Sequence, residues 1–211
     1  AGTDVFAMDT GNASTTIPVF DSGFPVDFAI NRKPASTTTW YTSARLMQER
    51  YIQTNAQASD NDDGGAMFDS NVGWAKDDYG TWDSDYQSWM WKRHPKGFEV
   101  VTYEGNTTGG HQIPHRLNAV PEMMWIKNRH RTCDWTVYHK GLNNGSNPGQ
   151  YYLVLNDSVA EQDDSSNGYK FNFTAPTSTY FQVGVADETN KDEQLIALLF
   201  ASVDGISKVG Y

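Results

Sequence analysis

The chain has 211 residues and a formal net charge of −10. An acidic chain lacks the excess of lysine and arginine that contacts with phosphate backbones need, so nucleic acid is not an expected partner. No apolar run reaches the length of a membrane span, so membrane insertion is not expected either. Aromatic residues make up 13% of the chain, which favours a β-rich protein.

Most of the predicted elements are strands, because apolar and polar residues alternate with a period of two. In the first half, residues 43–51 predict a helix of one or two turns through Ala44, Leu46 and Met47, and residues 86–92 predict a strand. In the second half, strands are predicted at 98–103, 123–127, 135–139, 151–156, 180–185 and 194–201. The last of these would also suit a short helix, but its counterpart at 86–92 alternates, which favours a strand. Turn-forming clusters lie between these runs, and we expect about seven strands in each half.

The second half of the chain repeats the pattern of the first half. Matching positions are Gly11 and Gly105, Asn31-Arg32 and Asn128-Arg129, Trp40 and Trp135, and Asn55 and Asn156. A period of about 100 residues is too long for a solenoid and has the size of a small domain. The sequence therefore predicts an all-β fold of two tandem antiparallel β-sandwich domains, jelly-roll-like, over residues 1–96 and 97–211.

Residues 205–211 resemble the start of a third repeat, since they can be aligned with residues 97–103. We therefore expect the chain to be a piece of a longer array. The alternative is a mature protein with a swapped terminal strand.

Several blocks of the sequence match a known family. In the second half they are residues 97–106, 113–117, 120–123, 126–129, 135–142, 174–178 and 200–210, with weaker matches at 30–32, 68–71 and 89–92. Together they resemble a repeated domain of uncharacterised function found in tail-fibre and tail-associated virion proteins of marine and cyanobacterial phages. The resemblance implies a structural module of a virion appendage, located in the virion outside the cell. It also implies assembly with other virion subunits, usually as a homo-oligomer, and no known catalytic residues.

One turn differs between the two halves and is the candidate binding site. Residues 77–86 carry aromatic residues among carboxylates, whereas their counterpart at 187–193 has none. Aromatic faces beside acids suit a host surface glycan, and exposed aromatics also anchor protein interfaces. The candidate ligand-binding residues are Tyr79, Trp82, Asp83 and Asp85. Glycan binding predicts exposure among Tyr79, Trp82, Trp74 and Tyr86. The alternatives are that Trp82 packs inside its own domain or against a neighbouring subunit.

Four positions recur in both halves although the loops around them differ, namely Arg32, Trp40, Arg129 and Trp135. A recurring arginine could bind an anionic ligand, but it more often pairs with a carboxylate at the end of a strand. Recurring tryptophans usually pack in the core or across strands. We therefore expect structural roles for all four.

No cofactor is expected. The acidic turn at residues 60–65 hints at a calcium loop, but Gly64 occupies the fifth position and no glutamate closes the loop. The histidines lack the convergence that zinc requires. The single cysteine, Cys133, cannot form an internal disulfide and has no catalytic partners in the sequence pattern, so it is expected to be a small, partly buried residue.

The protein is not expected to be an enzyme, since no pair of acids is marked as a hydrolase pair. The first alternative function is a non-catalytic carbohydrate-binding module, and the second is a glycan-degrading enzyme.

Overall fold

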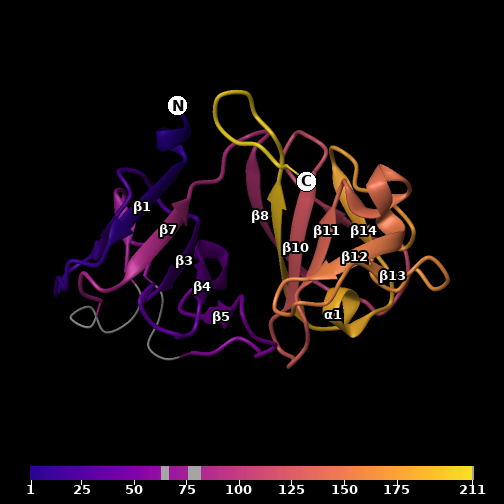
Figure 1. Ribbon diagram of the computed structural model, residues 1–211, viewed down its shortest axis with the longest axis horizontal. Coiled ribbons are helices and arrows are strands. Elements are labelled where there is room, and N and C mark those ends of the chain that lie inside the picture. The colour runs from indigo at the N-terminus through magenta and orange to yellow at the C-terminus, as the bar shows by residue number, and fades with distance from the viewer. Residues whose placement is uncertain (63–66, 76–81, 211) are drawn as a thin grey trace. The chain divides into compact units, whose positions relative to one another are not determined.

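The computed structural model describes residues 1–62, 67–75 and 82–210 (Figure 1). The fold is mostly β, with 35% of residues in strands and 8% in helices, and its sheets are antiparallel. The all-β prediction is therefore confirmed. The chain divides into two compact units: unit 1 is Ala1–Asn55 with Asp60–Arg93, and unit 2 is Ala56–Ser59 with His94–Tyr211.

Unit 1 contains one main sheet and one small sheet. The main sheet has the order β1-β7-β3-β4-β5, and β2 pairs with β6 in the small sheet. The strands are β1 (Phe6–Thr10), β2 (Phe20–Asp21), β3 (Phe28–Arg32), β4 (Tyr41–Ala44), β5 (Tyr51–Gln53), β6 (Gly73–Trp74) and β7 (Gln87–Trp91). Short 3-10 turns cover Gly2–Asp4 and Arg45–Met47. One apolar cluster joins the two sheets, with Phe20 and Trp74 from the small sheet and Ala29 and Met90 from the main sheet.

Unit 2 is built in the same way. Its main sheet has the order β13-β12-β11-β10-β15-β8, and β9 pairs with β14 in the small sheet. The strands are β8 (Phe98–Glu104), β9 (His111–Pro114), β10 (Met123–Asn128), β11 (Thr136–His139), β12 (Tyr151–Val154), β13 (Gln162–Asp163), β14 (Tyr180–Val183) and β15 (Gln194–Phe200). The helical pieces are 3-10 turns at Leu142–Gly145 and Pro148–Gln150 and the helix α1 (Asp187–Asn190).

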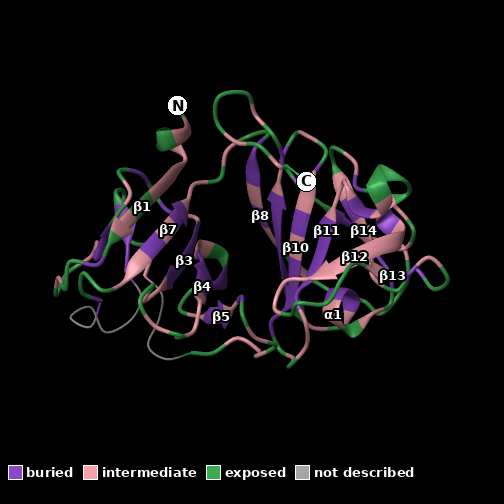
Figure 2. Cartoon of the chain, viewed as in Figure 1, coloured by how far each residue is buried: buried purple, intermediate pink, exposed green. Residues whose placement is uncertain are grey.

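The core of unit 2 also lies between its main and small sheets. Met124 and Leu199 from the main sheet share one apolar cluster with Ile113 and Phe181 from the small sheet. Strands β10 and β15 are largely buried, as Figure 2 shows. Central strands that are covered on both faces read as continuous apolar runs, which explains the composition of residues 194–200.

The two units have the same topology. The order β1-β7-β3-β4-β5 in unit 1 corresponds to β8-β15-β10-β11-β12 in unit 2, and the pair β2-β6 corresponds to β9-β14. Unit 2 adds β13 at one edge of its main sheet. The repeat seen in the sequence is therefore also a repeat of strand order.

The turn after the first strand of each unit has the same backbone geometry. Ala13 and Thr107 both have left-handed φ angles, 53° and 59°. Their N–H groups donate to the carbonyls of Trp82 and Asn190, at 3.0 and 2.8 Å respectively. Trp82 and Asn190 therefore occupy equivalent positions in the two units.

The seven predicted strands are confirmed. They correspond to β7, β8, β10, β11, β12, β14 and β15, with bounds that differ from the predicted ones by up to two residues. Among the described residues, unit 1 has seven strands and unit 2 has eight.

The helix predicted at residues 43–51 is wrong over most of its length. Only a 3-10 turn at Arg45–Met47 forms, between β4 and β5. Gln48 has a left-handed φ of 58°, which ends the turn. The Arg45 guanidinium donates to the carbonyls of Val26 and Phe68. These tertiary contacts, rather than helix propensity, determine the conformation of the segment.

Candidate functional site

The predicted binding turn is only partly described, and its tryptophan is buried. Tyr79 lies outside the described residues. Trp82 is 6% exposed, and its ring centroid lies 4.6 Å from that of Tyr86 and 5.8 Å from that of Tyr41. Trp74 is fully buried as well. The expectation of an exposed ring is therefore wrong for both tryptophans, because both fill the core of unit 1.

The acids of this turn are exposed and are held by the chain itself. The Asp83 carboxylate accepts the backbone N–H of Asp85 at 2.9 Å, and the Asp85 carboxylate pairs with Lys33. The hydrogen bond to Asp85 raises the pKa of Lys33 above its usual value. Asp83 and Asp85 thus lie close together, but the neighbouring Trp82 ring is buried in the core of unit 1.

The two recurring tryptophans are held in the same way. The backbone N–H of Trp40 donates to the Asn55 side chain at 3.0 Å, and that of Trp135 donates to the Asn156 side chain at 2.8 Å. Trp135 is fully buried, and Trp40 stacks on Trp89 with ring centroids 5.7 Å apart. Both tryptophans pack as expected, and the asparagine that follows each one is part of the repeated structure.

The recurring arginines contact groups that the sequence did not indicate. The Arg32 guanidinium lies 4.5 Å from the centre of the Trp40 ring and donates to the Ser36 carbonyl. Within the described ranges, the expected carboxylate partner is therefore wrong for Arg32, because a cation–π contact takes that place. Arg129 is 7% exposed and donates to the Gln194 side chain at 3.3 Å.

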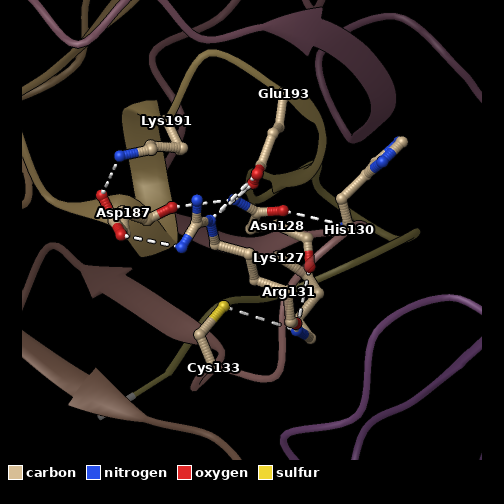
Figure 3. A network of polar contacts seen from close by, with 8 residues as sticks. All are labelled: Lys127, Asn128, His130, Arg131, Cys133, Asp187, Lys191 and Glu193. Atoms are coloured by element: carbon tan, nitrogen blue, oxygen red, sulfur yellow. Dashed lines mark hydrogen bonds and ion pairs between the residues drawn. The ribbon is translucent and has the colours of Figure 1, made fainter.

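A network of polar contacts in unit 2 lies at the end of β10 (Figure 3). The Nε atom of Arg131 donates to both carboxylate oxygens of Glu193, at 3.0 and 2.8 Å, and its Nη1 atom lies 3.2 Å from Asp187. Asp187 also pairs with Lys191 at 3.4 Å. The Asn128 amide donates to the Glu193 carboxylate at 2.9 Å. The network therefore joins the end of β10 to α1 and to the start of β15.

The charges in this network stabilise each other. Burial alone would raise the pKa of Glu193, but the hydrogen bonds from Arg131 and Asn128 outweigh it and lower that pKa below its usual value. The hydrogen bond to Glu193 raises the pKa of Arg131. Both groups therefore stay ionised near neutral pH, which suits an ion pair that fixes structure and not an acid or base that exchanges protons.

A fully buried lysine lies next to this network. Lys127 has no exposed surface, and its Nζ atom donates to the carbonyls of Gln57, Asn128 and Arg131 at 3.2, 2.9 and 2.9 Å. A buried ammonium group needs such partners, because an uncompensated charge is costly in the interior. Sequence reasoning missed this residue, although a lysine at the end of the apolar strand 123–127 was a usable signal.

The single cysteine contacts the same lysine. The Sγ atom of Cys133 lies 3.6 Å from Nζ of Lys127. Burial raises the pKa of the Cys133 thiol, and the nearby Lys127 charge only partly opposes this effect. The thiol is therefore protonated near neutral pH and is a poor nucleophile.

The described residues contain no group of three or more histidine, cysteine, aspartate or glutamate side chains that could hold a metal ion. In the acidic turn considered as a calcium loop, Arg50 pairs with Asp60 at 3.2 Å and with Asp62 at 3.9 Å. Residues 63–66 of that turn lie outside the described part of the chain. Across residues 1–62, 67–75 and 82–210, no helix combines the length and the apolar character that crossing a bilayer demands.

Two hollows lie on the surface of the described residues, one in each unit. One, of about 230 Å³, is lined in part by Arg45, whose guanidinium is engaged by the backbone carbonyls of Val26 and Phe68. The other, of about 370 Å³, is lined by Lys140, Gly141, Asn144 and Gly145.

Comparison with known proteins gives a family without an assigned activity. A domain of unknown function, DUF7483, matches residues 47–211. The match begins within unit 1 and continues through the whole of unit 2. Neither the curated proteins nor the solved structures include a match to the chain. Because the match covers well over half of its length, the chain belongs to the DUF7483 family.

Proposed function

We propose that the protein is a structural repeat module of a phage virion appendage, a tail fibre or a similar structure, and that it contributes to host attachment. The observation that carries this proposal is the duplicated topology, in which two units of one chain share the same strand order. Tandem copies of a self-contained β unit extend an appendage without requiring a catalytic centre. The sequence resemblance to repeated domains of phage tail proteins supports the same assignment.

Each unit is proposed to be an antiparallel β-sandwich of the jelly-roll type, with one in residues 1–96 and the other in residues 97–211. In support, each unit has a main sheet and a small sheet that share a single apolar cluster. Two sheets that pack face to face over one core are the basis of a sandwich.

The module is proposed to act without catalysis and without a cofactor. In support, burial raises the pKa of the Cys133 thiol, and Arg131 is held in an ion pair with Glu193, so both side chains favour structural roles. The proposed partners are other virion subunits, in a homo-oligomer, and a glycan on the host surface. The proposed location is the virion, outside the cell, with no contact to nucleic acid and no insertion into a membrane.

Immunogold electron microscopy of purified virions tests this proposal. Antibodies raised against the purified chain should place gold particles on an appendage of the phage that encodes it, and pre-incubation with the purified chain should remove the label. If the protein is abundant in infected cells but absent from purified particles, the proposal is wrong. Light scattering of the purified chain measures the expected homo-oligomer, and release of reducing sugar ends from polysaccharides would instead indicate a glycan-degrading enzyme.

A further inference from the structure

Two loops of unit 2, together with β14 and the residues that follow it, form a surface with exposed apolar side chains and free amide groups. We call it the aromatic–amide surface, and it comprises Gly109, Tyr169, Asn172, Phe173, Gln182 and Val185. The exposed fractions of Tyr169, Phe173 and Val185 are 49%, 46% and 47%. Large apolar side chains at this level of exposure, gathered in one place, mark binding surfaces.

Contacts between the segments hold these residues together. The backbone N–H of Ala186 donates to the Tyr169 carbonyl at 3.0 Å, which joins the segments of Tyr169 and Val185. The Val185 side chain and the Asn172 Oδ1 atom each lie 3.5 Å from the position that a Cβ atom would take on Gly109. The three segments therefore lie side by side in unit 2.

A pair of amides supplies polar groups beside the apolar side chains. The Asn172 Nδ2 atom donates to the Gln182 Oε1 atom at 3.0 Å. This bond leaves the Asn172 Oδ1 atom as an acceptor and the Gln182 Nε2 atom as a donor, and neither has a hydrogen-bond partner among the described residues. Both amides are partly exposed, so an acceptor and a donor are available to a ligand.

The backbone at this surface is strained. Asn172 and Phe173 have left-handed φ angles of 49° and 58°, and such an angle is unusual for a bulky residue such as phenylalanine. The Phe173 ring lies over Gly168, where a Cβ atom would fall 2.5 Å from the ring. Strain of this kind is often found where a side chain is held in place for a ligand.

We propose that the aromatic–amide surface binds an uncharged, hexose-based glycan. The rings of Tyr169 and Phe173 would pack against the C–H faces of sugar rings, and the free amide groups of Asn172 and Gln182 would bond to hydroxyl groups. An acidic glycan fits poorly, because the chain carries a net charge of −10 and the nearby Lys170 is paired with Glu188 at 2.8 Å. This inference rests on the proposed role in host attachment, to which it adds a ligand class and a site distinct from the turn at residues 77–86.

Binding of the full chain to immobilised laminarin, mannan and dextran, measured by biolayer interferometry, tests the proposal. Wild-type protein should bind at least one of these polysaccharides saturably. Tyr169→Ala and Val185→Ser should each weaken that binding about tenfold or more, because they remove exposed apolar contact area from the surface. Val120→Ser is the matched control, since Val120 is a 52% exposed valine of the same unit, and it should bind like wild type.

Three results would overturn the proposal. The first is an absence of saturable binding by folded wild-type protein, and the second is an equal loss of binding in Val120→Ser. The third is a change of oligomeric state in Tyr169→Ala or Val185→Ser, measured by light scattering, which would assign the surface to a contact between protein subunits. None of these results changes the immunogold labelling of virions, so this inference and the proposed function can fail separately.

Discussion

Replacing Asn190 by alanine should destabilise unit 2 strongly. Asn190 is fully buried in α1 and occupies the position that Trp82 has in unit 1. Its Nδ2 atom donates to the carbonyls of Thr108 and Gly184, at 2.8 and 2.5 Å. Its Oδ1 atom accepts the Asn106 N–H at 3.0 Å and lies 3.0 Å from Nδ1 of His111.

The expected loss of unfolding free energy is about 3–5 kcal/mol. A net contribution of about 1 kcal/mol is typical for a hydrogen bond, and a buried group left without its partner costs about 1–3 kcal/mol. Asn106 and Thr108 lie in an exposed loop, where water can replace the amide. Each of their hydrogen bonds should therefore cost an amount near the lower end of the range of about 1–3 kcal/mol when it is lost. Gly184 is buried, so the loss at its carbonyl belongs to the upper part.

Urea denaturation of wild type and Asn190→Ala measures this loss, and Asn167→Ala is the matched control because Asn167 is an exposed asparagine of the same unit. Hydrogen exchange, read by mass spectrometry, should speed up in residues 105–111 of Asn190→Ala and remain unchanged in unit 1. A loss below about 1 kcal/mol, similar to that of the control, would refute the reasoning, because the amide would then contribute no more than an exposed side chain.

Three further predictions concern side chains that are buried or partly buried. Trp82→Ala should destabilise unit 1 by about 3–5 kcal/mol in urea denaturation, because it empties space in the core; a loss below about 1 kcal/mol would contradict the packing of this ring. Burial lowers the pKa of His115 below its usual 6.5, and its Nδ1 atom accepts the Leu117 N–H at 3.3 Å while its Nε2 atom lies 3.1 Å from the Thr177 carbonyl. Below pH 6.5 the unfolded chain therefore binds more protons than the folded chain. The free energy of unfolding should consequently fall as the pH drops from 6.5. This part of the pH dependence should vanish in His115→Gln. The Cys133 thiol should react with Ellman's reagent at pH 7.5 at least about tenfold more slowly in the folded chain than in urea, and equal rates would show that burial does not protect it.

The strands and the duplication could be predicted from the residues alone. A period of two defines a strand locally, so β7 and β8 could be recognised without a partner strand, whereas the continuous apolar run of β15 was assigned to a strand through its counterpart β7. The repetition of Trp40 and Asn55 as Trp135 and Asn156 was visible in the same way, although the hydrogen bond inside each pair was not.

Which side chains face inward, and which distant loops meet, depends on the folded chain as a whole. Trp82 lies among carboxylates in the sequence, yet it is buried because the space between the sheets of unit 1 accepts its ring, as the space in unit 2 accepts Asn190. Lys127 is buried because the carbonyl of Gln57, 70 residues away in the chain, joins the nearby carbonyls of Asn128 and Arg131 around its ammonium group. Val185 lies against Gly109 only after the strands have paired. Local patterns carry no information on such contacts, because they depend on residues far apart in the chain.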